Sequence, residues 1–369
     1  MTKKIVLVGP KLNVTNKRAY GGGSGGYTRN MNVYLTFFRF NRFEIIPCFH
    51  SIRGEINLWA LNAPIRLFYD LYQFIKCLLK FDISGVHILA QYRGAIVREI
   101  LIILISNIFN KPVLYEIKAG SFESSYYSNN SLYRFFVNCV IRKSKLILVE
   151  GKPYINFLKK KYNVDCTLFP NVVPNIEIPT IINKKFNTDL IRVLFVGFAY
   201  KGKGVFELFD ACQELSKKGH NIRLTIVGKV HDDFKTYTKD GCSFNIVLKG
   251  KLDHGEVLKQ FNLNYIYCYP SKHDGEGHNN TINEALMHQM IVCSTLNGFI
   301  GSFLNKENSY PLRKVCKNEI KIRLNEIIEN KDLAVNKSIK GRELILHQFN
   351  TNIAQSILER EYIKLVAKH

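Results

Sequence analysis

Two glutamates, Glu276 and Glu284, are separated by seven residues in the segment SKHDGEGHNNTINEALMHQ. Between them, Asn279, Asn280 and Thr281 are residue types typical of a helix start. The free N–H groups and the positive dipole end of such a start suit a diphosphate. A carboxylate one turn inside the helix can accept hydrogen bonds from two hydroxyls of a ribose or a sugar. A capped surface helix with a solvated Glu284 explains the same pattern equally well.

Two lysines, Lys201 and Lys203, follow a predicted strand that ends at Gly197 in the segment VGFAYKGKGVFELFDA. Gly204 then opens the next predicted helix. Two ammonium groups at a strand-to-helix turn can bind a phosphate anion, as point charges added to the helix dipole. An ordinary lysine-rich loop is the alternative.

A glycine-rich run, GGGSGG at residues 21–26, contains a GxGxxG pattern that includes Gly23. A dinucleotide-binding fingerprint follows its strand immediately, whereas this run starts twelve positions after Gly9. The position therefore argues against dinucleotide binding. A glycine loop that opens a helix still lets the backbone approach a phosphate or sugar closely, and simple flexibility is the alternative.

Metal and cofactor chemistry have little support in the sequence. No Asp-x-Asp occurs, and Asp274 with Glu276 forms only a weak Asp-x-Glu pattern. The nine cysteines contain no CxxC pair, which favours reduced thiols in a cytoplasmic protein. His273, His278 and His288 flank the same helix, but His288 is more typical of a surface or core residue than of a ligand. We expect no metal and no cofactor.

The net charge is +22, from 52 basic and 30 acidic residues, and +14 of it lies in residues 1–180. Such an excess favours an anionic partner, and solvated lysines are the alternative. Nucleic acid is not expected, because no nucleic-acid-binding module is recognisable. Arg66, Lys76 and Lys80 in an apolar helix, and the lysines at 159–161, form clusters that suit an anionic membrane surface. The longest apolar run, residues 100–109, is too short to span a bilayer, so we expect a cytoplasmic protein that can lie on the inner face of the membrane.

Short apolar runs alternate with helical patterns, which predicts parallel sheets covered on both faces. In the first half we expect strands at 5–9, 43–49, 86–90, 112–117 and 145–150, with helices at 27–38, 63–80, 95–109 and 132–141. A proline-punctuated linker covers about 170–190. In the second half we expect strands at 191–198, 222–228, 245–250, 265–270 and 290–295, helices at 204–217, 254–261 and 281–288, and a long polar helical region at 318–363.

These segments, in this order, resemble the family 4 retaining glycosyltransferases, whose fold is called GT-B. The resemblance covers nearly the whole chain and rests on the glycine loop, KPVLYEIKAG, SKLILVEG, LFPNVVP, VGFAYKGKG, LTIVGK, LKGKLDHGEV and SKHDGEGHNNTINEAL. It implies an α/β protein with two Rossmann-like, doubly wound parallel-sheet domains facing a central cleft. The N-terminal acceptor domain would span 1–178, with a C-terminal helix at about 352–369 packing back on it, and the donor domain 179–351.

The resemblance also implies roles for the residues that match. Glu276 would lie by the donor sugar at the reacting centre, Glu284 would hold the donor ribose, and Lys203 would stabilise the departing diphosphate. The catalytic residues would be Glu276 and Lys203. Further donor contacts would come from the backbone of His278, Asn279, Asn280 and Thr281. The glycine loop of the other domain would contribute Gly23, and two loops near the nucleoside would contribute Gly228 and Lys251.

Three positions depart from the family pattern. Many members have Gly-Arg where this chain has Gly197-Phe198, and Lys201 is a candidate to replace the missing cation. Many have His where this chain has Lys118, which would place a cation beside the sugar. The usual aromatic-Gly pair is His278-Asn279 here, which leaves the donor sugar open.

The function implied is transfer of a sugar from a nucleotide-sugar to a glycan acceptor with retention of anomeric configuration. A lipid-linked acceptor in cell-surface polysaccharide assembly, of the O-antigen or capsule type, would suit the basic N-terminal half. A nucleotide-sugar epimerase of the same fold is the alternative enzyme, and a basic nucleic-acid-binding protein is the non-enzymatic one. The pair of glutamates in the family pattern, Glu276 and Glu284, favours sugar transfer over epimerisation.

Overall fold

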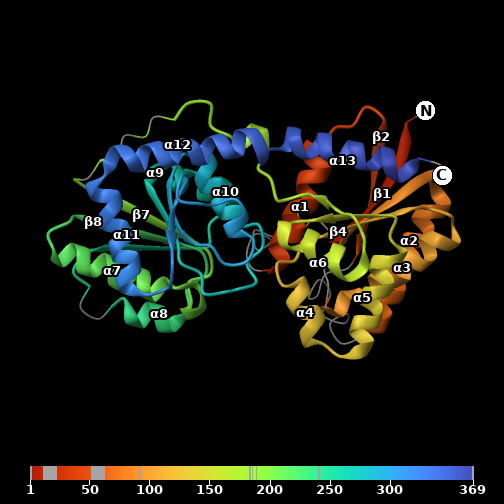
Figure 1. Cartoon of the computed structure of the whole chain (residues 1–369), viewed down its shortest axis with the longest axis horizontal. Helices are drawn as coiled ribbons and strands as arrows, with labels where there is room; N and C mark the ends of the chain where they lie inside the picture. Colours follow the sequence, from red (N-terminus) through yellow and green to blue (C-terminus); the bar gives the residue numbers. More distant parts are fainter. Residues whose placement is uncertain are drawn as a thin grey trace. The chain divides into compact units, whose positions relative to one another are not determined.

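Two six-stranded parallel sheets form the framework of the chain (Figure 1). The computed structural model describes residues 2–10, 23–50, 63–90, 93–182, 184, 186–187, 189–239 and 242–367. These divide into two compact units. The first contains the described residues from the N-terminal strand to Pro170, together with the segment from Thr351 onward, and the second contains the described residues between Asn171 and Asn350. The predicted α/β class with two doubly wound parallel sheets is confirmed.

The N-terminal sheet has the strand order β2-β1-β3-β4-β5-β6. Its strands are β1 (Lys3–Pro10), β2 (Phe43–His50), β3 (Ile83–Ala90), β4 (Val113–Ile117), β5 (Leu146–Val149) and β6 (Thr167–Leu168). Its helices are α1 (Gly23–Phe37), α2 (Ala63–Lys80), α3 (Ile96–Ile108), α4 (Phe122–Ser128), α5 (Ser131–Lys143), α6 (Lys152–Tyr162) and α13 (Thr351–Val366). The central strands are buried along nearly their whole length, as expected for a parallel sheet covered on both faces.

One face of this sheet contains a buried polar network that ties α13 to the strands. Glu116 of β4 accepts hydrogen bonds from the Tyr34 hydroxyl of α1 at 2.6 and 2.8 Å and lies 2.9 Å from His87 Nε2. His87 Nδ1 lies 2.8 Å from the Tyr362 hydroxyl of α13. Burial pushes the pKa of Glu116 up, but Lys118 and His87 outweigh it and hold that pKa below its ordinary value. The last helix therefore contributes core contacts to the N-terminal sheet.

The C-terminal sheet has the strand order β12-β11-β10-β7-β8-β9. Its strands are β7 (Ile191–Val196), β8 (Ile222–Val227), β9 (Asn245–Gly250), β10 (Ile266–Tyr269), β11 (Ile291–Thr295) and β12 (Tyr310–Leu312). Its helices are α7 (Val205–Lys217), α8 (Asp232–Tyr237), α9 (His254–Leu263), α10 (Asn280–Met287), α11 (Lys317–Glu329) and α12 (Lys331–Gln348). Strands β7, β8 and β9 lie side by side in chain order, and β10 pairs with the other edge of β7, followed by β11 and β12. The order therefore reverses between β7 and β10.

The structure adds elements that the sequence patterns did not predict and resolves the long helical region that they marked into separate helices. Helices α4 and α8 and strands β6 and β12 are short, so they contain too few residues to show a period, whereas α6 has 11 residues and was also missed. The polar helical region expected at 318–363 consists of three helices, α11, α12 and α13. Asn330 has a non-helical backbone between α11 and α12, and Phe349 between α12 and α13 accepts a 2.9 Å hydrogen bond from the Val173 N–H.

Among the described residues, no helix combines the length and the apolar character needed to cross a bilayer.

Removing the Tyr362 hydroxyl tests the network around α13. We expect Tyr362→Phe to lower the free energy of unfolding of the N-terminal unit by about 1–3 kcal/mol, because the buried His87 loses a hydrogen-bond partner. Urea titration, combined with hydrogen exchange of the β3 amides, measures this. Tyr127→Phe is the control, since Tyr127 is largely exposed, and equal effects of the two substitutions would contradict the assignment.

Candidate functional site

The best-supported site lies at the carboxyl ends of β7 and β10, where the strand order of the C-terminal sheet reverses. In open α/β sheets, ligands bind in the crevice outside this switch point. The turn after β7 is a short 3₁₀ helix, η4 (Lys201–Lys203), and the loop after β10 contains Glu276. The two motifs that the sequence marked separately are therefore brought together by the topology.

Lys203 and Glu276 form the centre of this site. The Lys203 ammonium makes an ion pair with Glu276 Oε1 and donates a 2.8 Å hydrogen bond to the Tyr269 hydroxyl. Ser271 Oγ donates to Glu276 Oε1 at 2.5 Å, and the Tyr269 hydroxyl donates to the same oxygen at 3.1 Å. Burial and then the neighbouring Glu276 carboxylate raise the pKa of Tyr269 well above its ordinary value, so its hydroxyl stays protonated.

Two glycines allow the loops around this centre to approach closely. Gly204 has φ +65°, and a Cβ there would lie 2.0 Å from the carbonyl oxygen of Pro270. Gly298 has φ +60°, and a Cβ there would lie 2.0 Å from the carbonyl oxygen of Glu276. Both positions need a residue without a side chain and with free access to positive φ. Gly204 therefore sets the spacing between the lysine turn and the β10 loop.

A third loop, after β11, holds the β10 loop in place and was missed by the sequence reasoning. Thr295 Oγ1 and Asn297 Nδ2 donate to the carbonyl oxygen of Ser271 at 2.9 and 3.1 Å. The Phe299 N–H donates to the carbonyl oxygen of Glu276 at 3.0 Å. The only signal in the sequence was a run of small polar residues and Gly298 after a predicted strand.

The start of α10 is capped by its own chain. Asn279 Oδ1 accepts hydrogen bonds from the Thr281 and Ile282 N–H groups at 2.9 and 3.2 Å and from Thr281 Oγ1 at 2.8 Å. The Thr281 hydroxyl also lies 2.6 Å from the Tyr267 hydroxyl. Asn280 is the first helical residue. The Thr281 N–H, one of the backbone groups expected to contact the donor, and the Ile282 N–H beside it are thus held by a neutral side-chain acceptor in this structure.

Glu284 and His278 are both buried. Glu284 lies inside α10 with its Oε1 4.0 Å from His254 Nδ1, and His254 Nε2 lies 3.0 Å from Glu177 Oε2. The His278 ring packs between Phe303 and Phe349, at centroid distances of 4.3 and 4.6 Å. The side chain of His278 therefore belongs to the core, and its carbonyl oxygen accepts a 2.7 Å hydrogen bond from Asn171 Nδ2.

The remaining predicted donor residues lie in several places. Lys201 and Lys251 are exposed, after β7 and β9 respectively. Gly228, after β8, has φ +123°, and a Cβ there would lie 2.1 Å from the carbonyl oxygen of Gly197. Gly23 is the first residue of α1, and the two residues before it in the glycine run lie outside the described residues.

Lys118, predicted to lie beside the donor sugar, is directed into the N-terminal unit. Its ammonium lies 3.1 Å from Glu116 Oε1 and donates a 2.7 Å hydrogen bond to the Phe169 carbonyl oxygen. The side chain is almost entirely buried. These contacts favour charge compensation of Glu116 as the role of this lysine.

Phe198 stands where the family pattern has a cation, and the structure places another cation beside it. The Lys229 ammonium lies 5.3 Å from the centroid of the Phe198 ring, which also packs against Tyr200. Lys229 follows β8, next to Gly228, and the sequence reasoning did not select it. It is therefore a second candidate, with Lys201, for the cation that Phe198 does not provide.

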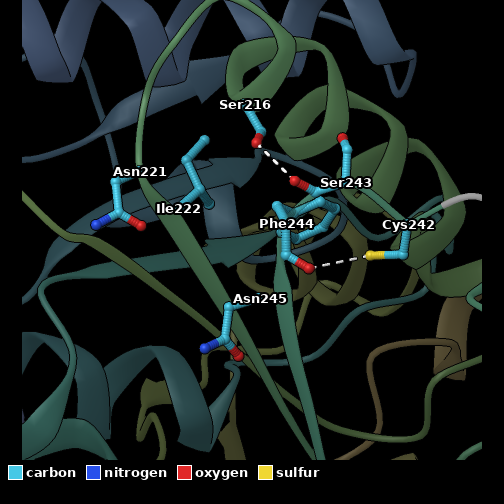
Figure 2. A pocket seen from close by; sticks show the side chains of 7 residues that line it. All are labelled: Ser216, Asn221, Ile222, Cys242, Ser243, Phe244 and Asn245. Carbon is cyan, nitrogen blue, oxygen red and sulfur yellow. Dashed lines mark hydrogen bonds between the residues drawn. The ribbon is translucent and has the colours of Figure 1, made fainter.

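A surface hollow in the same unit lies at the opposite edge of the sheet. Figure 2 shows it around Ile222 and Asn245, the first residues of β8 and β9. Its polar contacts are internal, since Ser216 Oγ donates to the Ser243 carbonyl and Cys242 Sγ donates to the Phe244 carbonyl. None of the described residues that line the hollow is charged, so these residues offer little to an anionic ligand.

Within the part of the chain that the structure describes, no three His, Cys, Asp or Glu side chains gather as metal ligands. His288 is buried, with its ring stacked on Phe261 and its Nδ1 2.7 Å from Asn262 Oδ1. His288 is therefore a core residue, one of the two placements that the sequence favoured.

Comparison with known proteins agrees with this fold. Residues 178–344 match the family model described as glycosyl transferases group 1. The chain is 25% identical over 341 residues to MJ1069, an uncharacterized glycosyltransferase of Methanocaldococcus jannaschii. This match covers 87% of this chain and 82% of MJ1069. It is 22% identical over 183 residues to CapM, a capsular polysaccharide biosynthesis glycosyltransferase of Staphylococcus aureus. That match covers 48% of this chain and 47% of CapM, so the chain spans about half the length of this relative.

Solved structures show the same architecture over whole chains. Sucrose-phosphate synthase of Thermosynechococcus elongatus has a TM-score of 0.74 at 14% identity and covers 98% of this chain and 99% of its own. A glycosyltransferase of Rickettsia africae has a TM-score of 0.69 at 13% identity and covers both chains completely. HepE of Anabaena, solved with UDP and glucose, has a TM-score of 0.65 at 13% identity, covering 98% of this chain and 99% of its own.

The two doubly wound parallel sheets and these structural likenesses define the fold class as GT-B. Residues 178–344, most of the C-terminal unit, match the group 1 glycosyltransferase family model.

The buried His288 predicts a specific pH dependence. Burial, followed by the charges of Lys184, Arg342 and His254, lowers the pKa of His288 to about 3, against about 6.5 for an unfolded histidine. The unfolded state then binds the extra proton, so stability is lost as the pH falls from about 6.5 toward 3, by up to about 1.4 kcal/mol per pH unit. We expect His288→Gln to flatten this loss in urea titrations at a series of pH values. The exposed His347→Gln is the control, and equal slopes in both variants would contradict the assignment.

Proposed function

We propose that this chain transfers a sugar from a nucleotide-sugar to a glycan acceptor, with the donor bound at the switch point of the C-terminal sheet. The observation that carries the proposal is the Lys203–Glu276 cluster, which lies where two strand ends and three loops converge. The cluster combines a cation for a phosphate with a carboxylate and hydroxyls for a sugar. The match of residues 178–344 to the group 1 glycosyltransferase model supports the reaction class, and the HepE structure, solved with UDP and glucose, supports a donor of this kind.

We propose that Lys203 stabilises the leaving diphosphate. As the bond between the anomeric carbon and the diphosphate oxygen breaks, negative charge develops on that oxygen. An ammonium held in place before the reaction stabilises this charge without reorganising in the transition state. Lys203 is held by Glu276 and Tyr269, and Lys201, Lys229 and the start of α10 add positive potential nearby. The proposal assigns this charge stabilisation to the protein rather than to a metal.

We further propose retention of anomeric configuration by a front-face route. The acceptor oxygen bonds to the anomeric carbon on the face that the diphosphate leaves, and the acceptor proton passes to the departing phosphate oxygen. Glu276 then orients the donor sugar, because its Oε1 is held by Lys203, Ser271 and Tyr269. Glu284 binds the donor ribose, and the N-terminal unit binds the acceptor.

The acceptor in this proposal is a lipid-linked glycan used in cell-surface polysaccharide assembly. Similarity to a capsular polysaccharide biosynthesis glycosyltransferase supports the polysaccharide class. The positive charge concentrated in residues 1–180 supports an acceptor held near an anionic surface.

Removing the Lys203 ammonium tests the mechanism. We expect Lys203→Ala to lower kcat by about 100- to 1,000-fold, the usual effect of losing one preorganised donor to a developing oxyanion. Steady-state kinetics with a nucleotide-sugar panel measure it, and Lys218→Ala, an exposed lysine at the end of α7, is the control. An unchanged kcat in Lys203→Ala would eliminate this role.

Nucleotide binding tests the donor site separately from turnover. We expect one of UDP, GDP, ADP or CMP at 100 times its Kd to stabilise the wild type by about 2.7 kcal/mol. In Glu284→Gln the same nucleotide at the same concentration should stabilise less, because a ribose hydrogen bond is weakened. Glu343→Gln, at an exposed position of α12, should behave as the wild type. Equal stabilisation in the wild type and Glu284→Gln would remove Glu284 from the site.

A further inference from the structure

Helix α2 has a buried stripe and an exposed apolar stripe. The residues that face the core are Asp70, Phe74 and Leu78. Ile65, Phe68, Tyr69, Tyr72 and Leu79 are the large apolar and aromatic residues exposed on the other side, with Phe68 exposed at 78% and Leu79 at 72%. Their spacing of three, four and seven residues places them on one helix face. A soluble domain rarely leaves such a row open to water without a use for it.

The exposed aromatic residues line a shallow hollow at the start of α2. Its walls are Pro64, Ile65, Phe68, Tyr69 and Tyr72, and all of them are apolar or aromatic residues. Such a hollow suits hydrocarbon, whereas a phosphate or a sugar would find few hydrogen-bond partners in it.

Exposed apolar residues continue from α2 onto its neighbours in the same unit. Helix α3 packs against both α2 and α5, and the three helices lie together in Figure 1. On α3 the exposed residues are Val97, Leu104 and Ile108, which repeat at helical spacing, and on α5 they are Leu132 and Phe135. We call the exposed side of α2, α3 and α5 the helical face.

The charges on the helical face are almost all positive. The only acid of α2, Asp70, is buried and lies 3.4 Å from Arg98, whereas Lys76 and Lys80 are exposed. Glu99 of α3 is also buried, where it accepts a 2.5 Å hydrogen bond from the Tyr115 hydroxyl. The sequence of α5 contains three basic residues and no acid. The acids of these helices are thus turned inward, whereas Lys76, Lys80, Arg142 and Lys143 are exposed.

We propose that the helical face docks on the surface of an anionic phospholipid bilayer, with the aromatic residues of α2 in the headgroup region. Aromatic side chains favour the membrane interface, and each lysine near an anionic surface adds attraction. Apolar residues flanked by bases are typical of helices that lie in the plane of the interface. A second copy of the chain fits less well, because a symmetric contact would place the lysines of α2 against one another.

The second basic cluster expected from the sequence, at 159–161, is partly engaged within the protein. Lys159 lies 2.9 Å from Asp165, and the Lys161 ammonium lies 4.5 Å from the centroid of the Tyr126 ring. The proposal therefore rests on α2 and its neighbours. It deepens the lipid-linked acceptor of the proposed function, and it is tested with neither donor nor acceptor present, so docking and transfer can fail separately.

The experiment is flotation of the full chain with vesicles of phosphatidylglycerol and phosphatidylcholine, compared with vesicles of phosphatidylcholine alone. We expect binding to the anionic vesicles at low salt, which weakens as salt rises. The charge variant Lys76→Glu with Lys80→Glu should bind at least ~30-fold more weakly, from about 1 kcal/mol for each lysine removed. The aromatic variant Phe68→Ser with Tyr72→Ser should lose the part of the vesicle binding that persists at high salt.

Matched substitutions on the C-terminal unit complete the test. Ile322→Ser and Lys331→Glu change one exposed apolar residue and one exposed base there, and each should bind as the wild type does. Unchanged melting temperatures exclude misfolding of the α2 variants. No wild-type binding to the anionic vesicles would overturn the proposal, as would equal binding by the aromatic variant. A chain that dimerises through α2, by sedimentation, and does not bind vesicles would overturn it in favour of self-association.

Discussion

The ion pair between Lys203 and Glu276 is the constraint on which the geometry of the C-terminal unit depends. Two partly buried charges are stable only when each has its partner and further hydrogen bonds. Ser271 and Tyr269 supply those bonds to the carboxylate. The loop that carries them must therefore keep one shape, and the β11 loop enforces it by donating two hydrogen bonds to the Ser271 carbonyl oxygen. The geometry of this ion pair thus depends on the ends of three adjacent strands, β7, β10 and β11.

The same ion pair determines the electrostatics of the site before a ligand binds. With Glu276 in contact, the positive charge of Lys203 is largely compensated before any ligand arrives. The capped start of α10 repeats this pattern, because Asn279 already satisfies two N–H groups there. An incoming anion must compete with these internal partners. A weak anion gains little from such an exchange, whereas a diphosphate with several charged oxygens gains more.

The sequence predicted the fold well because the two sheets are parallel and buried, so their strands appear as short apolar runs between helical patterns. Helix α2 was predicted with both of its ends correct, since its charged and amide residues recur every three or four positions in an otherwise largely apolar segment. The sequence also marked Lys203 and Glu276, but their contact depends on strand order, which no local pattern shows. Lys118 illustrates the limit most clearly. The family resemblance placed it beside the donor sugar, yet its partner Glu116 lies two residues earlier in the chain and holds its ammonium inside the N-terminal unit.

The placement of α13 has a consequence for how the protein is made. Tyr362 completes a buried network with His87 and Glu116, so the core of the first unit includes residues from the end of the chain. A ribosome releases this helix only after the entire second unit has been synthesised. Domains made first usually fold first. Here the first domain can complete its core only after α13 has been made. A shortened protein that contains the N-terminal unit alone must therefore include α13.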